Sequence, residues 1–149
     1  MITIREVVAE DAAEITVLSH QLGYSISEQQ TLQNIYLLKQ TKQHEVFVAV
    51  HEQKVIGWMG LFYNISLTSP PLCEIQGLVV HEQYRSKGIG KMLIEKAKEW
   101  SINKSTKKLR LRCNIKRTEA ILFYQKIGFA EVKQQKVFEM KIITNEGVD

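Results

Sequence analysis

A six-residue segment between a strand-forming run and a helix-forming run constrains this chain most. The segment reads Arg-Ser-Lys-Gly-Ile-Gly at residues 85–90, after the strand-forming residues 75–80 and before the helix-forming residues 91–100. Its glycines lack Cβ atoms, so the backbone can take unusual dihedral angles and a ligand can approach closely. The first amides of a helix and the helix dipole favour negative charge at such a point. The segment therefore predicts a loop that binds an anion such as a pyrophosphate, although glycines also occur in strand-to-helix turns for conformational reasons alone.

The hydrophobic pattern along the 149 residues predicts strands and helices in a definite order. It indicates a strand near the N-terminus, two helices, three strands, the helix after the glycine loop, a strand, a helix and a final hairpin. The final hairpin is expected over residues 129–132 and 136–143. This order predicts an α/β fold with a single central mixed sheet flanked by helices, formed as one domain over residues 1–149.

Residues near the expected helix ends predict how these helices begin and stop. Asp11 followed by Glu14 resembles a capping box at the start of the first helix. Ser27 is expected to cap the second helix. Gly128 stands where a left-handed residue would end the last helix.

Composition argues against several classes of protein. The chain is 44% hydrophobic and 24% charged, as in ordinary globular proteins. No apolar stretch approaches the ~18 residues of a membrane span, and the N-terminus has no signal-peptide core. The net charge of +4 favours anionic partners, but the basic residues are spread along the chain without an RNA-binding motif. We therefore expect a cytoplasmic protein with neither a nucleic acid nor a membrane as its partner.

Metal and disulfide chemistry is not indicated by the sequence. Cys73 and Cys113 lie far apart and lack the C-x-x-C spacing of zinc or redox sites, so we expect two reduced, buried thiols. The histidines lie in different elements without metal-ligand spacing; they are His20, His44, His51 and His81. We therefore expect no metal site.

The element order and two motifs resemble the GNAT N-acetyltransferases, which move acetyl from acetyl-CoA to an amine. Residues 85–90 match the family signature Q/R-x-x-G-x-G/A, and residues 123–129 match its F-Y-x-x-x-G-F ending. The resemblance covers essentially the whole chain and implies the acyl-CoA N-acyltransferase fold. Residues 74–80 and 114–117 are also similar to the small-molecule branch that includes aminoalkylphosphonate N-acetyltransferases. Ser86 stands where this branch commonly has glycine.

The resemblance implies which residues hold acetyl-CoA as the cosubstrate. Backbone groups of Leu78, Val79 and Val80 would pair with the pantetheine arm like an extra strand, and one of their amides would hold the oxyanion. Asn114 would hydrogen-bond the cofactor or, alternatively, cap a helix. The pyrophosphate would bind to the glycine loop, which consists of Arg85, Ser86, Lys87, Gly88, Ile89 and Gly90.

Acetyl transfer needs a neutral amine and a leaving thiolate that gains a proton. A primary alkyl amine has a pKa of about 10.4, so a general base or a desolvating site assists its attack. The resemblance implies Tyr124 as the general acid for the thiolate, and the alternative is a tyrosine that only packs. Glu74, 11 residues before Arg85, is the candidate base. The alternative for Glu74 is an exposed strand carboxylate, with the amine deprotonated through water.

The sequence therefore predicts an acetyl-CoA-dependent N-acetyltransferase that acts on a primary amine of a small molecule. Two alternatives stay open: acetylation of a protein lysine or N-terminus, and a non-catalytic acyl-CoA-binding sensor. Dimerisation through the last strands is common in the family, so a homodimer belongs to the expected partners.

Overall fold

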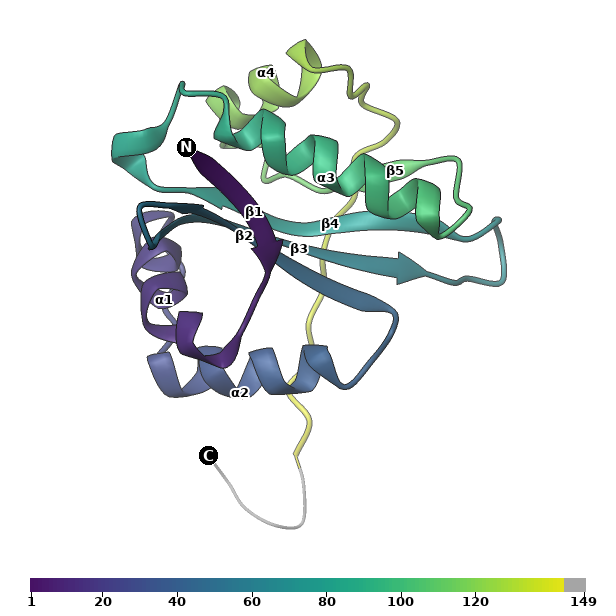
Figure 1. The fold of residues 1–149 in the computed structure, drawn as a ribbon. Coiled ribbons are helices and arrows are strands. Elements are labelled where there is room, and N and C mark those ends of the chain that lie inside the picture. The colour runs from purple at the N-terminus through teal and green to yellow at the C-terminus, as the bar shows by residue number, and fades with distance from the viewer. Residues whose placement is uncertain (144–149) are drawn as a thin grey trace. The chain divides into compact units, whose positions relative to one another are not determined.

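The computed structural model describes residues 1–143 and divides the chain into two compact units, residues 1–112 and residues from 113 onward. The first unit is built on one five-stranded sheet in the order β1-β2-β3-β4-β5 (Figure 1). Neighbouring strands from β1 to β4 are antiparallel, whereas β5 runs parallel to β4. The predicted mixed sheet is therefore confirmed. Its strands are β1 (Ile2–Glu6), β2 (His44–His51), β3 (Lys54–Asn64), β4 (Leu72–Val80) and β5 (Leu109–Leu111).

Helices cover both faces of this sheet. Helices α1 (Ala12–Gln21) and α2 (Glu28–Lys39) lie on one face, and α3 (Ile89–Asn103) lies on the other (Figure 1). Two short helical turns, η1 (Ala9–Asp11) and η2 (Glu82–Tyr84), precede α1 and the glycine loop. Each fully buried aliphatic side chain contributes about 1.5–3 kcal/mol. Under α1 and α2 the buried side chains include Ile15, Leu18, Ile35, Val46, Val48, Val55 and Val79, and α3 buries Ile89, Leu93, Ile94 and Ala97.

A β-bulge in β4 determines which side chains share a face. Gly60 pairs with Gly77, but the next residue of β3, Leu61, pairs with Ile75. Gln76 is therefore an extra residue, and the alternation of side chains reverses across it. As a result, Glu74 before the bulge and Gly77 after it lie on the same face of the sheet, the one covered by α1 and α2.

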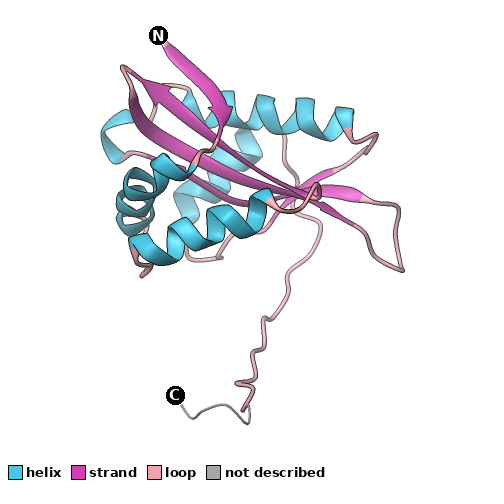
Figure 2. Cartoon of the chain, turned by 60° about the horizontal axis from the view of Figure 1, so that its bottom comes forward, coloured by secondary structure: helices cyan, strands magenta, loops and turns pink. Residues whose placement is uncertain are grey.

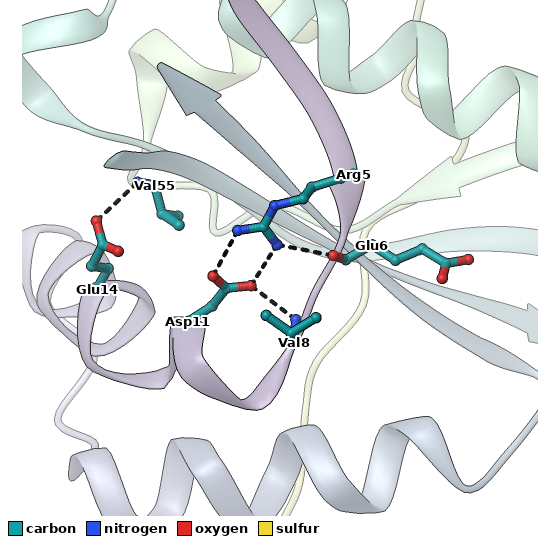
Figure 3. Close-up of polar contacts among 6 residues, drawn as sticks. All are labelled: Arg5, Glu6, Val8, Asp11, Glu14 and Val55. Carbon is teal, nitrogen blue, oxygen red and sulfur yellow. Dashed lines mark hydrogen bonds and ion pairs between the residues drawn. The ribbon is translucent and has the colours of Figure 1, made fainter. Parts of the chain in front are cut away.

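The N-terminal segment is fixed by carboxylates that act differently from the predicted capping box (Figure 3). The Asp11 side chain makes no cap hydrogen bond to α1. Its oxygens accept hydrogen bonds from Arg5 at 2.8 and 2.9 Å and from the Val8 amide at 2.9 Å. Glu14 instead accepts a hydrogen bond at 2.9 Å from the Val55 amide of β3. The capping-box prediction is wrong because Arg5 and the Val8 amide bind the Asp11 carboxylate and the Val55 amide binds that of Glu14.

The predicted cap of the second helix is confirmed. The Ser27 hydroxyl accepts a hydrogen bond from the Gln30 amide at 3.0 Å, directly before α2. In the second unit, α4 spans Thr118–Lys126, and Gly128 follows with a φ of +114°. The left-handed glycine predicted after this helix is therefore also confirmed.

The final hairpin predicted over residues 129–132 and 136–143 is wrong. No strand forms within residues 129–143, which Figure 2 draws as loop. Val137 and Phe138 are 90% and 86% exposed. The side chains alternate as they would in a strand, but a strand also needs a neighbouring backbone, and these residues pair with none within the described part of the chain.

Two further expectations concern the cysteines and the membrane. Both thiols are free, Cys73 is buried as expected, and Cys113 is partly exposed, so the expected burial of Cys113 is wrong. Cys113 follows the short strand β5 after one residue and lies outside the sheet that buries Cys73. Within residues 1–143, every helix is too short or too polar to cross a bilayer.

Candidate functional site

The glycine loop has the backbone conformation that its sequence predicts. Gly88 is the N-cap of α3 with a φ of +83°, and Ser86 has a φ of +64°. The N-cap has no side chain that bonds the first amides of α3, so these amides receive no side-chain cap. A left-handed serine costs about 1–2 kcal/mol, which explains why glycine suits position 86. Residues 85–88 are exposed, so the amides at the start of α3 lie beside an accessible loop.

Two cations and an aromatic ring lie at this loop. The Arg85 Nε donates a hydrogen bond to the Val80 carbonyl at 3.3 Å, which connects the loop to the end of β4. The Lys87 ammonium lies 5.3 Å from the centre of the Tyr84 ring. The Tyr84 hydroxyl in turn lies 3.3 Å from Nδ1 of His51, the last residue of β2. These contacts hold positive charge next to the start of α3, as an anion site requires.

The part of β4 that leads to the loop has a strand on one side only. Leu78, Val79 and Val80 pair with β3. On the other side, β5 pairs with β4 at residues 73–75 and ends at Leu111. Within the described residues, the β4 edge beyond Ile75 therefore has no strand partner, and an extended ligand can bind to its backbone groups.

Glu74 is buried on the face covered by α1 and α2. It is only 4% exposed, which excludes the alternative of an exposed strand carboxylate. One carboxylate oxygen lies 3.5 Å from Nη1 of Arg110 and 3.4 Å from Nη2 of Arg112. Two guanidinium groups offset the cost of burying this charge and fix its orientation. The Glu74 carboxylate is therefore held in one orientation in the interior of the protein.

A row of side chains crosses the sheet at Glu74. Glu74 pairs with Phe62 of β3 and with Arg110 of β5, and Phe62 pairs with His44 of β2. The His44 and Phe62 rings are stacked, with centroids 5.8 Å apart and planes at 18°. Farther along β3, on the same face, the Trp58 ring lies directly on Gly77. Of this row, the sequence pointed only to Glu74, because the other residues lie far from it in the sequence.

Tyr124 and Asn114 belong to the second unit. Tyr124 of α4 is 9% exposed, and its ring contacts those of Phe123 and Phe129 edge-on, with centroids 5.4 and 5.9 Å apart. Asn114 is exposed, and its Oδ1 accepts a hydrogen bond from the Lys116 amide at 2.9 Å. The N-cap of α4 is Arg117, so the alternative that Asn114 caps a helix is wrong, and its contact with the cofactor stays a prediction. The first unit thus brings together Glu74, residues 78–80 and the glycine loop along one strand and its continuation.

Comparison with protein families identifies the fold. A model of the acetyltransferase (GNAT) family matches residues 9–129. The chain belongs to this family. The matched range includes β4, the glycine loop and α4. At the level of the family, the resemblance given by the sequence motifs is confirmed.

Individual relatives agree with the family. The acetyltransferase is 43% identical over 54 residues to an uncharacterized N-acetyltransferase of Chlorobaculum tepidum; the match spans 36% of this chain and about a third, 32%, of that relative. Among solved structures, aminoglycoside N-acetyltransferase AAC(6')-Iy in complex with CoA has a TM-score of 0.84 at 19% identity, covering 95% of this chain and 96% of that chain. Aminoglycoside 6'-N-acetyltransferase AAC(6')-Ig from Acinetobacter haemolyticus has a TM-score of 0.82 at 19% identity, covering 94% and 99%. These structures confirm the predicted fold.

Proposed function

We propose that this acetyltransferase moves acetyl from acetyl-CoA to a primary amine of a small molecule by direct attack. The observation that carries the proposal is the continuity of β4 with the glycine loop. The open edge at Leu78, Val79 and Val80 ends beside an exposed loop with two cations, Arg85 and Lys87. Acetyl-CoA has a peptide-like pantetheine arm followed by a pyrophosphate, so it needs a strand edge followed by an anion site.

The residues would act on the reacting atoms as follows. The amine nitrogen attacks the thioester carbonyl carbon, and a backbone amide of residues 78–80 stabilises the oxyanion. When the intermediate collapses, the C–S bond breaks and the thiolate receives the phenolic proton of Tyr124. A position on α4, within the family match, and burial of its ring support this role for Tyr124. We extend the proposal to Asn114 as a cofactor contact and to a single catalytic domain over residues 1–149.

Glu74 is the proposed base for the amine. The amine must lose a proton during the reaction, and Glu74 would take it directly or through water. Its burial and its two arginine partners support a carboxylate of fixed orientation. Arg110 and Arg112 would then act as positioning residues.

Two similarities support a small molecule as the acceptor. Solved aminoglycoside N-acetyltransferases have the same fold. The sequence of β4 is similar to that of the aminoalkylphosphonate N-acetyltransferases. Both point to small molecules that carry primary amines. The alternatives are a protein lysine or N-terminus as the acceptor, and a sensor that binds acyl-CoA without turnover. We also propose a cytoplasmic location.

A thiol-release assay with acetyl-CoA tests this function. The panel contains 2-aminoethylphosphonate, kanamycin, putrescine, amino acids and lysine-containing peptides. Turnover of one or more small amines above the rate with peptides is the expected result. Turnover of peptides alone would replace the small molecule with a protein acceptor. Tight binding of acetyl-CoA without turnover of any compound would identify a sensor.

A homodimer is the proposed assembly. Six large apolar residues of the last described segment are 72–90% exposed; they are Val132, Val137, Phe138, Met140, Ile142 and Ile143. A second copy would bury these side chains, which a monomer leaves in water. Light scattering after size exclusion should give twice the mass of 17.2 kDa, and the double change of Phe138→Asp and Ile142→Asp should give the monomer. A wild-type monomer at micromolar concentration would contradict the assembly.

A further inference from the structure

The ring of Tyr84, directly before the glycine loop, is held by residues at the ends of two strands. Its hydroxyl lies 3.3 Å from Nδ1 of His51, the last residue of β2. The His51 and His81 rings both contact the Tyr84 ring edge-on, with centroids 5.7 Å away and planes at 67° and 87°. His81 directly follows β4, and its carbonyl accepts a hydrogen bond from the Tyr84 amide at 2.8 Å. These contacts hold the half-buried ring in one position.

The turn η2, which carries Tyr84, is itself joined to the sheet and to α1. The His81 amide donates a hydrogen bond to the Ile56 carbonyl of β3 at 2.8 Å. The Glu82 amide donates one to the side-chain oxygen of Gln21, the last residue of α1, at 3.1 Å. Tyr84 is therefore a fixed point directly before a loop whose residues are exposed.

The side chain of Lys87 lies over this fixed ring. Its ammonium group is 5.3 Å from the centre of the Tyr84 ring, within the ~6 Å of a cation–π contact. Within residues 1–143, no carboxylate forms an ion pair with Lys87, so its charge remains available to an anion. An ammonium group has three N–H donors, and a contact with a ring leaves donors free for phosphate oxygens. A side chain that is already ordered also loses less conformational entropy when it binds a ligand.

We propose that Tyr84 is a positioning residue of the cosubstrate site, which holds the Lys87 ammonium at the glycine loop for the pyrophosphate of acetyl-CoA. The inference rests on the proposed function and assigns the contact to binding of acetyl-CoA, not to the chemical step. The other cation of the loop, Arg85, is held by its hydrogen bond to the Val80 carbonyl of β4. The two cations therefore have different supports, and only Lys87 depends on Tyr84.

A double-mutant cycle tests whether Tyr84 acts through Lys87. Isothermal titration calorimetry with CoA gives the Kd of wild type, Tyr84→Leu, Lys87→Met and the double variant. Tyr84→Leu should raise the Kd about fivefold and Lys87→Met about tenfold, because the first loses the order of the cation and the second loses the cation. The double variant should bind like Lys87→Met, within 1.5-fold, since the two residues form one unit. Effects that multiply in the double variant would overturn the inference.

Two further variants show which part of Tyr84 matters. Tyr84→Phe keeps the ring over which Lys87 lies and loses only the hydroxyl contact with His51, so its Kd for CoA should rise less than twofold. An equal loss in Tyr84→Phe and Tyr84→Leu would contradict the role of the ring. Lys98→Met is the matched control, because Lys98 of α3 pairs with Glu95 and should not affect the Kd.

A truncated cosubstrate separates the positioning role from a general effect on the fold. S-acetylpantetheine carries the thioester and the pantetheine arm but no phosphate. In the thiol-release assay, Tyr84→Leu should lower kcat/KM for acetyl-CoA about fivefold through KM alone, and change the value for S-acetylpantetheine by less than 1.5-fold. An equal fall with both thioesters would show that Tyr84 only supports the fold.

The same measurements distinguish this inference from the proposed function. If wild type binds CoA and acetylates an amine while Tyr84→Leu keeps the Kd for CoA, the positioning role is wrong and the function stands. If wild type binds CoA, shows the coupling of Tyr84 with Lys87 and acetylates no amine, the positioning role stands and the function is wrong. If wild type does not bind CoA, both are overturned.

Discussion

The guanidinium group of Arg5 lies 2.8 and 2.9 Å from the two carboxylate oxygens of Asp11 and joins β1 to the start of α1 (Figure 3). Asp11 is 4% exposed. Burial alone would raise the pKa of Asp11, but the hydrogen bonds from Arg5 and the Val8 amide and the positive charge of Arg5 lower it below 3.8. The ionised carboxylate is therefore the form that stabilises this fold.

Asp11→Asn should destabilise the protein at neutral pH by about 1–3 kcal/mol, because a buried pair loses its charge and one of its acceptors. A carboxylate with a lowered folded pKa contributes stability above its unfolded pKa, and this contribution is lost as the pH falls through the folded pKa. The difference in unfolding free energy between wild type and Asp11→Asn should therefore shrink from pH 7 to pH 3 in urea titrations. Glu95→Gln, which removes an exposed pair with Lys98, is the control and should change stability by less than about 1 kcal/mol. A difference for Asp11→Asn that is independent of pH would contradict the role of its charge.

Glu45 should have the opposite pH dependence. Burial raises its pKa above 4.5, and the neighbouring Glu6 carboxylate raises it further. The folded state then binds the proton more tightly than the unfolded state, so stability is lost as the pH rises from 4.5 through the folded pKa. Glu45→Gln should stabilise the protein at pH 7 by up to about 1 kcal/mol and have less effect at pH 4, in the same urea titrations. Glu52→Gln at an exposed turn should change neither value, and a destabilised Glu45→Gln at pH 7 would show that the charge is favourable.

Glycine at position 86 should preserve the binding of acetyl-CoA, whereas valine there should weaken it. Its φ of +64° lies in the left-handed region, where a β-branched residue is strained by about 1–2 kcal/mol. We expect Ser86→Gly to keep the Kd for acetyl-CoA within twofold and Ser86→Val to raise it about tenfold, the equivalent of 1.4 kcal/mol. Isothermal titration calorimetry measures both values. Equal affinities of the valine and glycine variants would show that acetyl-CoA does not need this conformation.

Tyr124→Phe should lower kcat about 100-fold or more, the usual contribution of a general acid, and leave the Kd for acetyl-CoA unchanged. Phe123→Leu disturbs the packing around the Tyr124 ring but keeps the hydroxyl. If both variants lose the same activity, the hydroxyl has no special role.

The sequence predicted most elements because hydrophobic spacing and glycine placement act locally. The loop at Arg85–Gly90 follows from the conformations that glycine permits, and Ser27 caps α2 through an amide three residues away. The bulge at Gln76 could not be predicted, because the side chains of residues 75–80 do not determine which of them face α1 and α2 and which face α3. Nor could two contacts with strands be predicted: that of Asp11 with Arg5 of β1 and that of Glu14 with the Val55 amide of β3.

The candidate site was predictable only where one segment forms it. Residues 78–80 and the loop lie on adjacent stretches of chain, so their order in sequence is their order in space. The row of His44, Phe62 and Glu74 depends on the registers of three strands, which no local pattern fixes. The strand predicted over residues 136–143 is wrong for the same reason. Alternating side chains indicate that a strand could form, but they do not indicate where a partner backbone lies.

The bulge makes Gln76 the residue of β4 whose loss would disturb the strand pairing least. Because Gln76 is unpaired, deleting it would give an even ladder in which Gly77, Leu78 and Val79 keep their partners and their faces. Deleting a residue beyond the bulge would instead bring Gln76 into the ladder and move every residue between the two positions to the opposite face. In this acetyltransferase, β4 therefore has one residue more than its pairing with β3 requires.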